Sequence, residues 1–312
     1  MTIPKQFQFS FIIFAACALL AGCINANNKA ADLYQETAFV PSANAQPSAQ
    51  DSVLKISLAV NEAYCLKTAC SCIADLSARE YDQLVDILLT KYNIDLQLTY
   101  YIEEYEMVDS LRTKAFDGVI CKPWLAFMLV PEYKIDYKRV ADLLDPSNNQ
   151  WLTGHFIVKI ESEIKSMKEI TGKSLAIGQP DSYEKYHLPM AMLKEGKITP
   201  KETIYKASCL ETLNMLHENE VEVAVISDYS LTASCAVDFI TPNEFRSIGV
   251  TAQMPLCSVI LDMAKVSEAD ALRLQKALLE ISGDSAPAGL LSRGFVSPAS
   301  WIPVPYVTAE TK

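Results

Sequence analysis

The chain has 312 residues, of which 50% are hydrophobic and 21% charged, and its formal net charge is −11. Such an acidic balance excludes nucleic acid as a partner and argues against adhesion to an anionic lipid surface. Beyond its N-terminal leader the chain is long enough to bury a large core, and about 260 residues normally divide into two domains.

The N-terminus predicts a bacterial lipoprotein. Lys5 precedes an apolar run at 9–20 that is too short for a permanent membrane-spanning helix, so residues 1–22 are expected to be a signal peptide. The segment LLAGC, which ends at Cys23, resembles a lipobox, in which cleavage exposes an acylated cysteine. The alternative is an ordinary secretory signal with an incidental cysteine.

Residues 23–50 are rich in Asn, Ala, Gln, Ser and Pro and predict a flexible tether. Such a tether would let a folded body move while acylated Cys23 stays in the lipid membrane. We therefore expect the protein on the periplasmic side of a bacterial membrane. Ile24 is not the acidic residue that usually retains a lipoprotein at the inner membrane, so inner and outer membranes both stay open.

Strand and helix patterns alternate after residue 51. Ser77 and Glu80 form a capping-box pattern ahead of a helix with Leu84 and Leu88 on its apolar face, and Val108 belongs to a second helical pattern. Apolar runs predict strands at 53–60 and 117–121, and the alternation of Ile94, Leu96 and Leu98 predicts another at 94–98. The order strand, helix, strand, helix, strand is typical of an α/β domain.

The same alternation returns after Trp151. Strands are expected at 174–177, 203–207 and 221–227, with helical patterns at 182–196 and 209–220. Two such units in tandem predict two α/β domains that face each other. The remaining elements are too few for a third domain, so we expect them to complete the first; they are strands at 245–250 and 257–263 and helices at 267–281 and 286–291.

Four blocks carry a resemblance to a known family: YIEEYEMVDSLRTKAFDGVICKPWLAF, GKSLAIGQPDSYEKYHLPMAMLKEGKITP, EVEVAVISDYSL and FRSIGVTAQMPLCSVIL. From about Val53 to Phe295 the chain resembles the periplasmic solute-binding proteins of the phosphate, phosphite and phosphonate ABC transporters. The resemblance implies the two-lobed type II periplasmic binding protein fold, an α/β fold in which each lobe is a mixed sheet flanked by helices. Lobe 1 would comprise 51–148 and 245–312, and lobe 2 would comprise 149–244.

The resemblance also implies a function. A small-molecule ligand would be captured by hinge closure across linkers at 146–154 and 239–245 and presented to an ABC transporter permease or a sensor. No cofactor is expected, and the protein would be a monomer. An enzyme is not expected, because the sequence lacks a nucleophile elbow, a P-loop and a GxGxxG motif. Its three histidines lie apart, and we expect His187 at the surface, although it could reach a ligand.

Ligands of open α/β sheets bind outside the carboxyl ends of the strands, and two lobes close both such ends over one cleft. Four segments should face it, at 61–64, 121–124, 179–183 and 227–229. The candidate ligand-binding residues are Glu62, Tyr64, Lys122, Trp124, Ser182, Tyr183, Asp228 and Tyr229. Alternatives are a solvated loop for Lys122, core packing for Trp124 and a helix N-cap for Asp228.

One loop departs from the family that the chain resembles. In that family the loop opens a helix with small hydroxyl residues and glycine, which wrap an oxyanion. Here the stretch is PDSYE at 180–184, in which Ser182 alone keeps a hydroxyl of this kind, while Asp181 and Glu184 add two carboxylates that would compete with a phosphate. We therefore expect a small polar ligand, for which an oxyanion is one candidate.

Seven cysteines remain after the signal peptide and Cys23, and pairing is expected in an oxidising periplasm. Cys209 and Cys235 are expected to form a disulfide in lobe 2, and Cys257 to be a buried free thiol. The remaining four would converge at the cleft if the first and third strands are neighbours, as the resemblance implies; they are Cys65, Cys70, Cys72 and Cys121.

Three interpretations of this cluster stay open: two disulfides, a copper(I) or zinc site, or a labile redox pair. A metal site would make the protein a periplasmic thiol or soft-metal handling protein built on the same fold, which is the alternative function. A redox enzyme is a more distant alternative.

Overall fold

The computed structural model describes residues 52–62, 65, 67–68, 79–113, 116–126, 136–180, 182–231 and 241–301. All of them belong to one compact unit, Pro47–Lys312. Within these ranges no helix is long and apolar enough to span a membrane. Several predictions fall outside the described residues: the signal peptide, lipidated Cys23, the tether, Tyr64, Cys70, Cys72, Ser77, Asp181 and Cys235.

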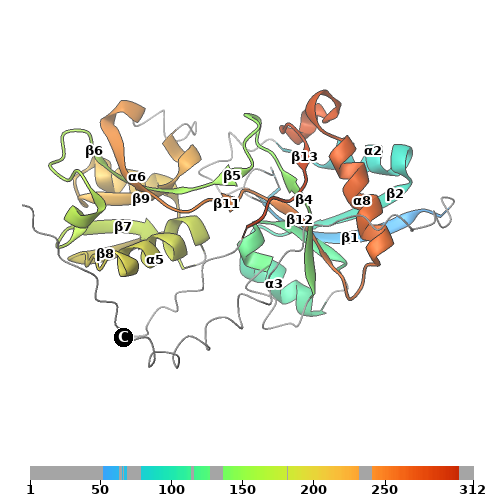
Figure 1. Ribbon diagram of the computed structural model, residues 1–312, viewed down its shortest axis with the longest axis horizontal. Coiled ribbons are helices and arrows are strands. Elements are labelled where there is room, and N and C mark those ends of the chain that lie inside the picture. Colours follow the sequence, from blue (N-terminus) through green and yellow to red (C-terminus); the bar gives the residue numbers. More distant parts are fainter. Residues whose placement is uncertain are drawn as a thin grey trace, which may run out of the picture. The chain divides into compact units, whose positions relative to one another are not determined.

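The first lobe is built on a six-stranded mixed sheet with the strand order β13-β4-β12-β3-β1-β2 (Figure 1). Its strands are β1 (Leu54–Asn61), β2 (Ile94–Tyr100), β3 (Gly118–Cys121), β4 (Tyr137–Leu143), β12 (Ser258–Asp262) and β13 (Phe295–Val296). β1 runs parallel to both β2 and β3, whereas β12 is antiparallel to β3 and β4. The expected neighbourhood of the first and third strands is therefore confirmed.

Helices α2 (Asp82–Tyr92), α3 (Glu104–Thr113) and α8 (Glu268–Glu280) pack on this sheet. α2 buries Leu84 and Leu88 and ends at Asn93, whose φ of 58° turns the chain into β2. The expected capping box does not start this helix: Tyr81 is the N-cap residue, without a side-chain capping bond. Tyr81 is instead buried in the lobe core.

The second lobe has a five-stranded mixed sheet with the order β10-β6-β9-β7-β8. Its strands are β6 (Gly154–Lys159), β7 (Ser174–Gly178), β8 (Glu202–Lys206), β9 (Val223–Ser227) and β10 (Phe245–Val250). Its helices are α5 (Leu188–Glu195), preceded by the π turn η3 (Tyr183–His187), and α6 (Cys209–His217). A capping box of Ser208 and Glu211 starts α6.

β10 corrects the expected domain boundary. It pairs with β6 in the second sheet, although we expected 245–250 to return to the first lobe. The chain instead crosses back through β11 (Met254–Pro255), which pairs antiparallel with β5 (Trp151–Leu152). Figure 1 shows this short pair between the two large sheets. The first expected linker contains β5, but the second lies after β10 and not at 239–245.

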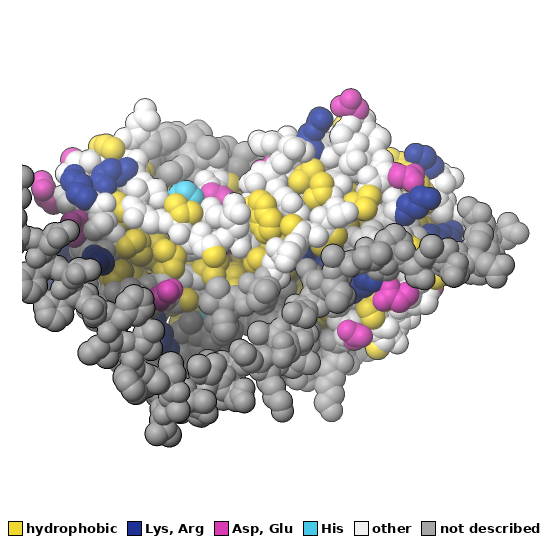
Figure 2. All heavy atoms as spheres, viewed as in Figure 1, with side chains coloured by type: hydrophobic (Ala, Val, Ile, Leu, Met, Phe, Trp, Pro, Cys, Tyr) yellow, Lys and Arg dark blue, Asp and Glu magenta, His cyan; other side chains and the backbone are white. Residues whose placement is uncertain are grey.

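Short helical turns complete the described chain: η2 (Met167–Ile170), η4 (Asp228–Leu231), η5 (Pro242–Glu244), η6 (Gly283–Ser285) and η7 (Ala288–Leu290). The last of these is a single 3₁₀ turn where a short helix was expected. Apolar side chains fill both faces of each sheet. On the face shown in Figure 2, basic and acidic side chains are interspersed and do not gather by sign.

Candidate functional site

An ion pair joins the two lobes at the carboxyl ends of their strands. Lys122 follows β3 directly, and Glu184 lies in the π turn after β7. The distance from Lys122 Nζ to Glu184 Oε1 is 3.1 Å, and the side chains are 19% and 0% exposed. Ser227, the last residue of β9, donates from Oγ to the same Oε1 at 2.9 Å. The ends of three strands from both sheets thus meet at one carboxylate.

Both partners of this pair are charged at neutral pH. Burial alone would raise the pKa of Glu184, but the ammonium groups of Lys122 and Lys185 outweigh it and lower that pKa to about 2. Burial would lower the pKa of Lys122, yet the Glu184 carboxylate more than compensates and the pKa is raised. The pair is therefore a fully buried anion held by a partly buried cation.

Aromatic rings from both lobes lie beside the ion pair. The rings of Trp124 and Tyr183 are nearly parallel, with centroids 6.0 Å apart and planes at 16°. His187 lies 5.6 Å from the Trp124 ring, and the Trp301 ring meets Tyr183 edge-on at 5.9 Å. Tyr229 packs against the same cluster. Trp124 and Tyr183 are buried members of this apolar cluster, as the core-packing alternative for Trp124 predicts, and Trp301 adds a contact that the sequence did not indicate.

The expected surface position of His187 is wrong, because the side chain is only 2% exposed. The π turn directs Tyr183, Glu184, Tyr186 and His187 all into the interior. His187 donates from Nε2 to the carbonyl oxygen of Pro180 at 2.6 Å. The ring therefore ties the loop after β7 to the start of α5.

Two candidate ligand residues bind the protein's own backbone. The Ser182 hydroxyl is the N-cap of the π turn and accepts from the Lys185 amide at 3.4 Å. The Asp228 carboxylate accepts from the Thr153 amide at 3.0 Å, the Thr153 hydroxyl at 2.9 Å and the Tyr229 amide at 2.8 Å. Burial raises the pKa of Asp228. Asp228 therefore fastens the end of β9 to the segment between β5 and β6.

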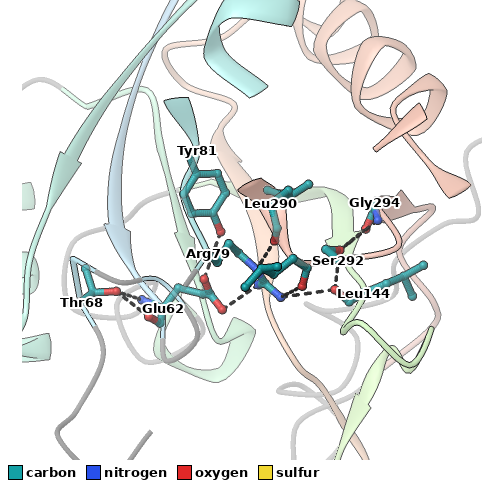
Figure 3. A network of polar contacts seen from close by, with 9 residues as sticks. Glu62, Thr68, Arg79, Tyr81, Leu144, Leu290, Ser292 and Gly294 are labelled. Carbon is teal, nitrogen blue, oxygen red and sulfur yellow. Dashed lines mark hydrogen bonds and ion pairs between the residues drawn. The ribbon is translucent and has the colours of Figure 1, made fainter. Parts of the chain in front are cut away.

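Glu62 lies in the core of the first lobe, although we expected it to face a ligand. Its Oε1 accepts from Arg79 Nη1 at 2.8 Å and its Oε2 from the Tyr81 hydroxyl at 3.2 Å (Figure 3). Arg79 also donates from Nε to the Leu290 carbonyl at 2.8 Å. Thr68 binds the Glu62 backbone. This network anchors the start of the loop after β1 to the C-terminal part of the chain.

The described cysteines do not form one cluster. Cys65 packs in the core on the α2 and α8 side of the first sheet, whereas Cys121 packs with Trp124 in the core that also contains Tyr183. Burial raises the pKa of both thiols. Among the residues that the structure describes, no group of three His, Cys, Asp or Glu could hold a metal ion.

The two other described cysteines are also buried and free. This confirms Cys257 as a buried free thiol. Cys209 lies 3.8 Å from the Ser227 hydroxyl, and because its thiol is free the predicted disulfide with Cys235 is not found in this structure.

Glu184 and Trp301 are not among the site residues that the sequence predicts. The sequence indicates Glu184 only as a competitor for an anion, and the burial of its carboxylate depends on the π turn, which apolar periodicity does not distinguish from an ordinary helix turn. Ser227 lies in the segment 227–229, which the strand-end rule places at the cleft, although it is not among the candidate ligand-binding residues. Nothing in the sequence around Trp301 indicated its contact with Tyr183.

Comparisons with known proteins agree with this arrangement. A family model described as the periplasmic substrate-binding protein of phosphonate ABC transporters matches residues 74–299. No curated protein sequence matches the chain.

Among solved structures, XAC2383 from Xanthomonas citri bound to ATP has a TM-score of 0.60 at 17% identity, covering 79% of this chain and 91% of that one. PhnD1 from Prochlorococcus marinus in complex with methylphosphonate has a TM-score of 0.55 at 10% identity, covering 79% and 93%. A binding protein component of an ABC phosphonate transporter from Pseudomonas aeruginosa has a TM-score of 0.56 at 14% identity, covering 79% and 82%. Similarity at these identities confirms the expected two-lobed fold.

Proposed function

Because the chain belongs to the family of periplasmic substrate-binding proteins of phosphonate ABC transporters, we propose that it is a lipid-anchored receptor for one small polar ligand. The ligand would bind between the two lobes and be presented to a permease or a sensor. Acylated Cys23 would hold the protein on the periplasmic side of the membrane, and residues 23–50 would give the folded body its reach.

One observation carries this proposal: the strand ends of both sheets converge on the same few side chains. Lys122 and Trp124 come from the first lobe, and Tyr183, Glu184 and Ser227 come from the second. Ligand sites in α/β proteins lie at such strand ends, where a few polar groups sit among aromatic side chains. Lobes connected through two short crossing strands can separate and close around a ligand there.

The chain offers its own reporter for a binding experiment. It contains three tryptophans, of which Trp124 and Trp301 lie in the aromatic group and Trp151 lies in the crossing strand β5. The soluble body purified from a periplasm should release a co-purified small molecule on denaturation, identifiable by mass spectrometry. Adding that compound back should change the tryptophan fluorescence and raise the Tm.

A Trp124→Ala variant should lose this response, whereas Leu272→Ala, at an exposed position on α8, should keep it. A protein that releases no compound, and that shows no response to a panel of phosphonates, amino acids and nucleotides, would contradict the proposal. The anchor has a separate test: Cys23→Ala should move the protein from the membrane fraction to the soluble fraction.

A further inference from the structure

The Glu184 carboxylate occupies the place between the lobes where a bound anion would find its donors. Its Oε1 accepts from the Lys122 ammonium at 3.1 Å and from the Ser227 hydroxyl at 2.9 Å. A cation and a hydroxyl converging at the ends of strands from two lobes are the groups that would hold a ligand oxyanion. Here the protein supplies that anion itself.

A free oxyanion would meet a heavy penalty at this position. Glu184 is completely buried, so its negative charge is screened little by water. A second anion beside it would lose its own hydration and find Lys122 already engaged. Lys185 is no free substitute, because its ammonium also acts on Glu184 and lowers the pKa of that carboxylate.

The Glu184 carboxylate can still accept a hydrogen bond from a ligand. Its second oxygen, Oε2, is buried, and no donor from the described residues reaches it. The indole Nε1 of Trp124 is also buried, and within the described ranges it meets no acceptor. A buried carboxylate oxygen without a donor is costly, and a hydrogen-bond donor on a ligand would remove that cost.

We propose that Glu184 is the specificity-determining residue of this site: an internal anion that excludes free oxyanions and favours ligands presenting a hydrogen-bond donor. The inference rests on the proposed function and names its ligand class. Methylphosphonate, a small oxyanion, is therefore expected to be rejected by the natural protein.

The test is calorimetric titration of methylphosphonate into the natural protein and the variants Glu184→Ser and Glu184→Gln. Serine removes the carboxylate and opens space beside Lys122, whereas glutamine removes the charge at nearly constant volume. The natural protein should bind methylphosphonate at least about tenfold more weakly than Glu184→Ser, because the substitution frees one charge-assisted contact. The matched control Glu195→Ser, at the exposed end of α5, should bind it as weakly as the natural protein.

Each outcome separates this inference from the proposed function. Methylphosphonate binding to the natural protein as tightly as to Glu184→Ser would overturn the inference and leave the receptor function standing. Binding to none of the proteins would also overturn it, and the co-purified compound would then decide the receptor function independently. Circular dichroism shows which variants are folded. If the Glu184→Ser variant does not fold, the isosteric Glu184→Gln variant is compared with the natural protein in its place. Binding of methylphosphonate to the natural protein as tightly as to the folded variant would overturn the inference in either case.

Discussion

The guanidinium of Arg79 and the carboxylate of Glu62 form a 2.8 Å ion pair inside the first lobe, where the two side chains are 1% and 2% exposed. The Tyr81 hydroxyl and the Leu290 carbonyl supply further partners (Figure 3). Burial and the neighbouring Glu62 raise the pKa of Tyr81 well above its ordinary value, so its hydroxyl stays protonated and donates. Through the bond from Arg79 to Leu290, this network connects the segment after β1 to the C-terminal part of the chain.

Glu62→Gln should lower the free energy of unfolding by about 3–5 kcal/mol, because it leaves the Arg79 charge buried without its anion. Urea denaturation measures the change. Glu268→Gln is the matched control, since Glu268 pairs with Lys138 at 2.6 Å but is 68% exposed. This control should cost at most about 1 kcal/mol. Equal decreases in the free energy of unfolding would show that the buried Glu62–Arg79 pair contributes no more stability than the exposed Glu268–Lys138 pair.

Acid should weaken the contact between the lobes in a defined window. The pKa of Glu184 lies at about 2 in the folded protein against an ordinary 4.5. A lowered pKa contributes stability that is complete above pH 4.5 and is lost as the pH falls towards 2. The Tm difference between the natural protein and Glu184→Gln should therefore shrink across this window. A Tm difference that stays constant as the pH falls to about 2 would contradict the assignment of a charged, paired Glu184.

Gly154 should tolerate no side chain. A Cβ at this position would overlap the backbone carbonyl of Glu184. Gly154→Ala should therefore lower the unfolding free energy by about 1–3 kcal/mol, as overpacking usually does, and should weaken binding of the co-purified compound by shifting the π turn. Gly289→Ala is the control, because its Cβ would meet Gln83 at an ordinary 3.4 Å. A folded Gly154→Ala variant that binds the compound with natural affinity would show that the contact between Gly154 and the π turn does not affect binding.

The buried thiols should be chemically inert in the folded protein. Burial raises the pKa of Cys65, Cys121 and Cys257, and only the thiolate is a strong nucleophile. Iodoacetamide at neutral pH should leave these three cysteines unmodified in the native protein and modify them after denaturation, as peptide mass spectrometry would show. Rapid native alkylation of Cys65 would instead indicate an accessible site and would revive the thiol and soft-metal alternative.

Two strands that the sequence predicts, β7 and β9, are continuous hydrophobic runs because both of their faces are buried. β4 was missed because Lys138, Arg139 and Asp142 interrupt its pattern, yet Asp142 is fully buried by pairing with Arg139 and Ser258. A paired charge can thus be buried within a strand, whereas a prediction from apolar residues alone treats charged residues as exposed.

Topology indicates which candidate residues lie near one another better than residue type does. The rule that ligands bind at strand ends selects Trp124 and Tyr183, whose rings pack together, and Lys122, which pairs with Glu184. The same rule placed Glu62 in the site, because the sequence gives no sign that Arg79 would reach it inside the core. It also missed Trp301, whose approach to Tyr183 is a long-range contact that no local pattern encodes.

The routing of the chain also sets an order of assembly. The second sheet uses only residues between Gly154 and Val250, so it can form as soon as that contiguous segment has been synthesised. The first sheet waits for β12, which inserts between β3 and β4 after more than a hundred intervening residues. Until it arrives, the edges of β3 and β4 are unpaired and open to other chains. The first lobe thus starts earlier in the sequence but completes its sheet after the second lobe. A chain truncated before Ser258 would lack β12, the strand that joins β3 to β4.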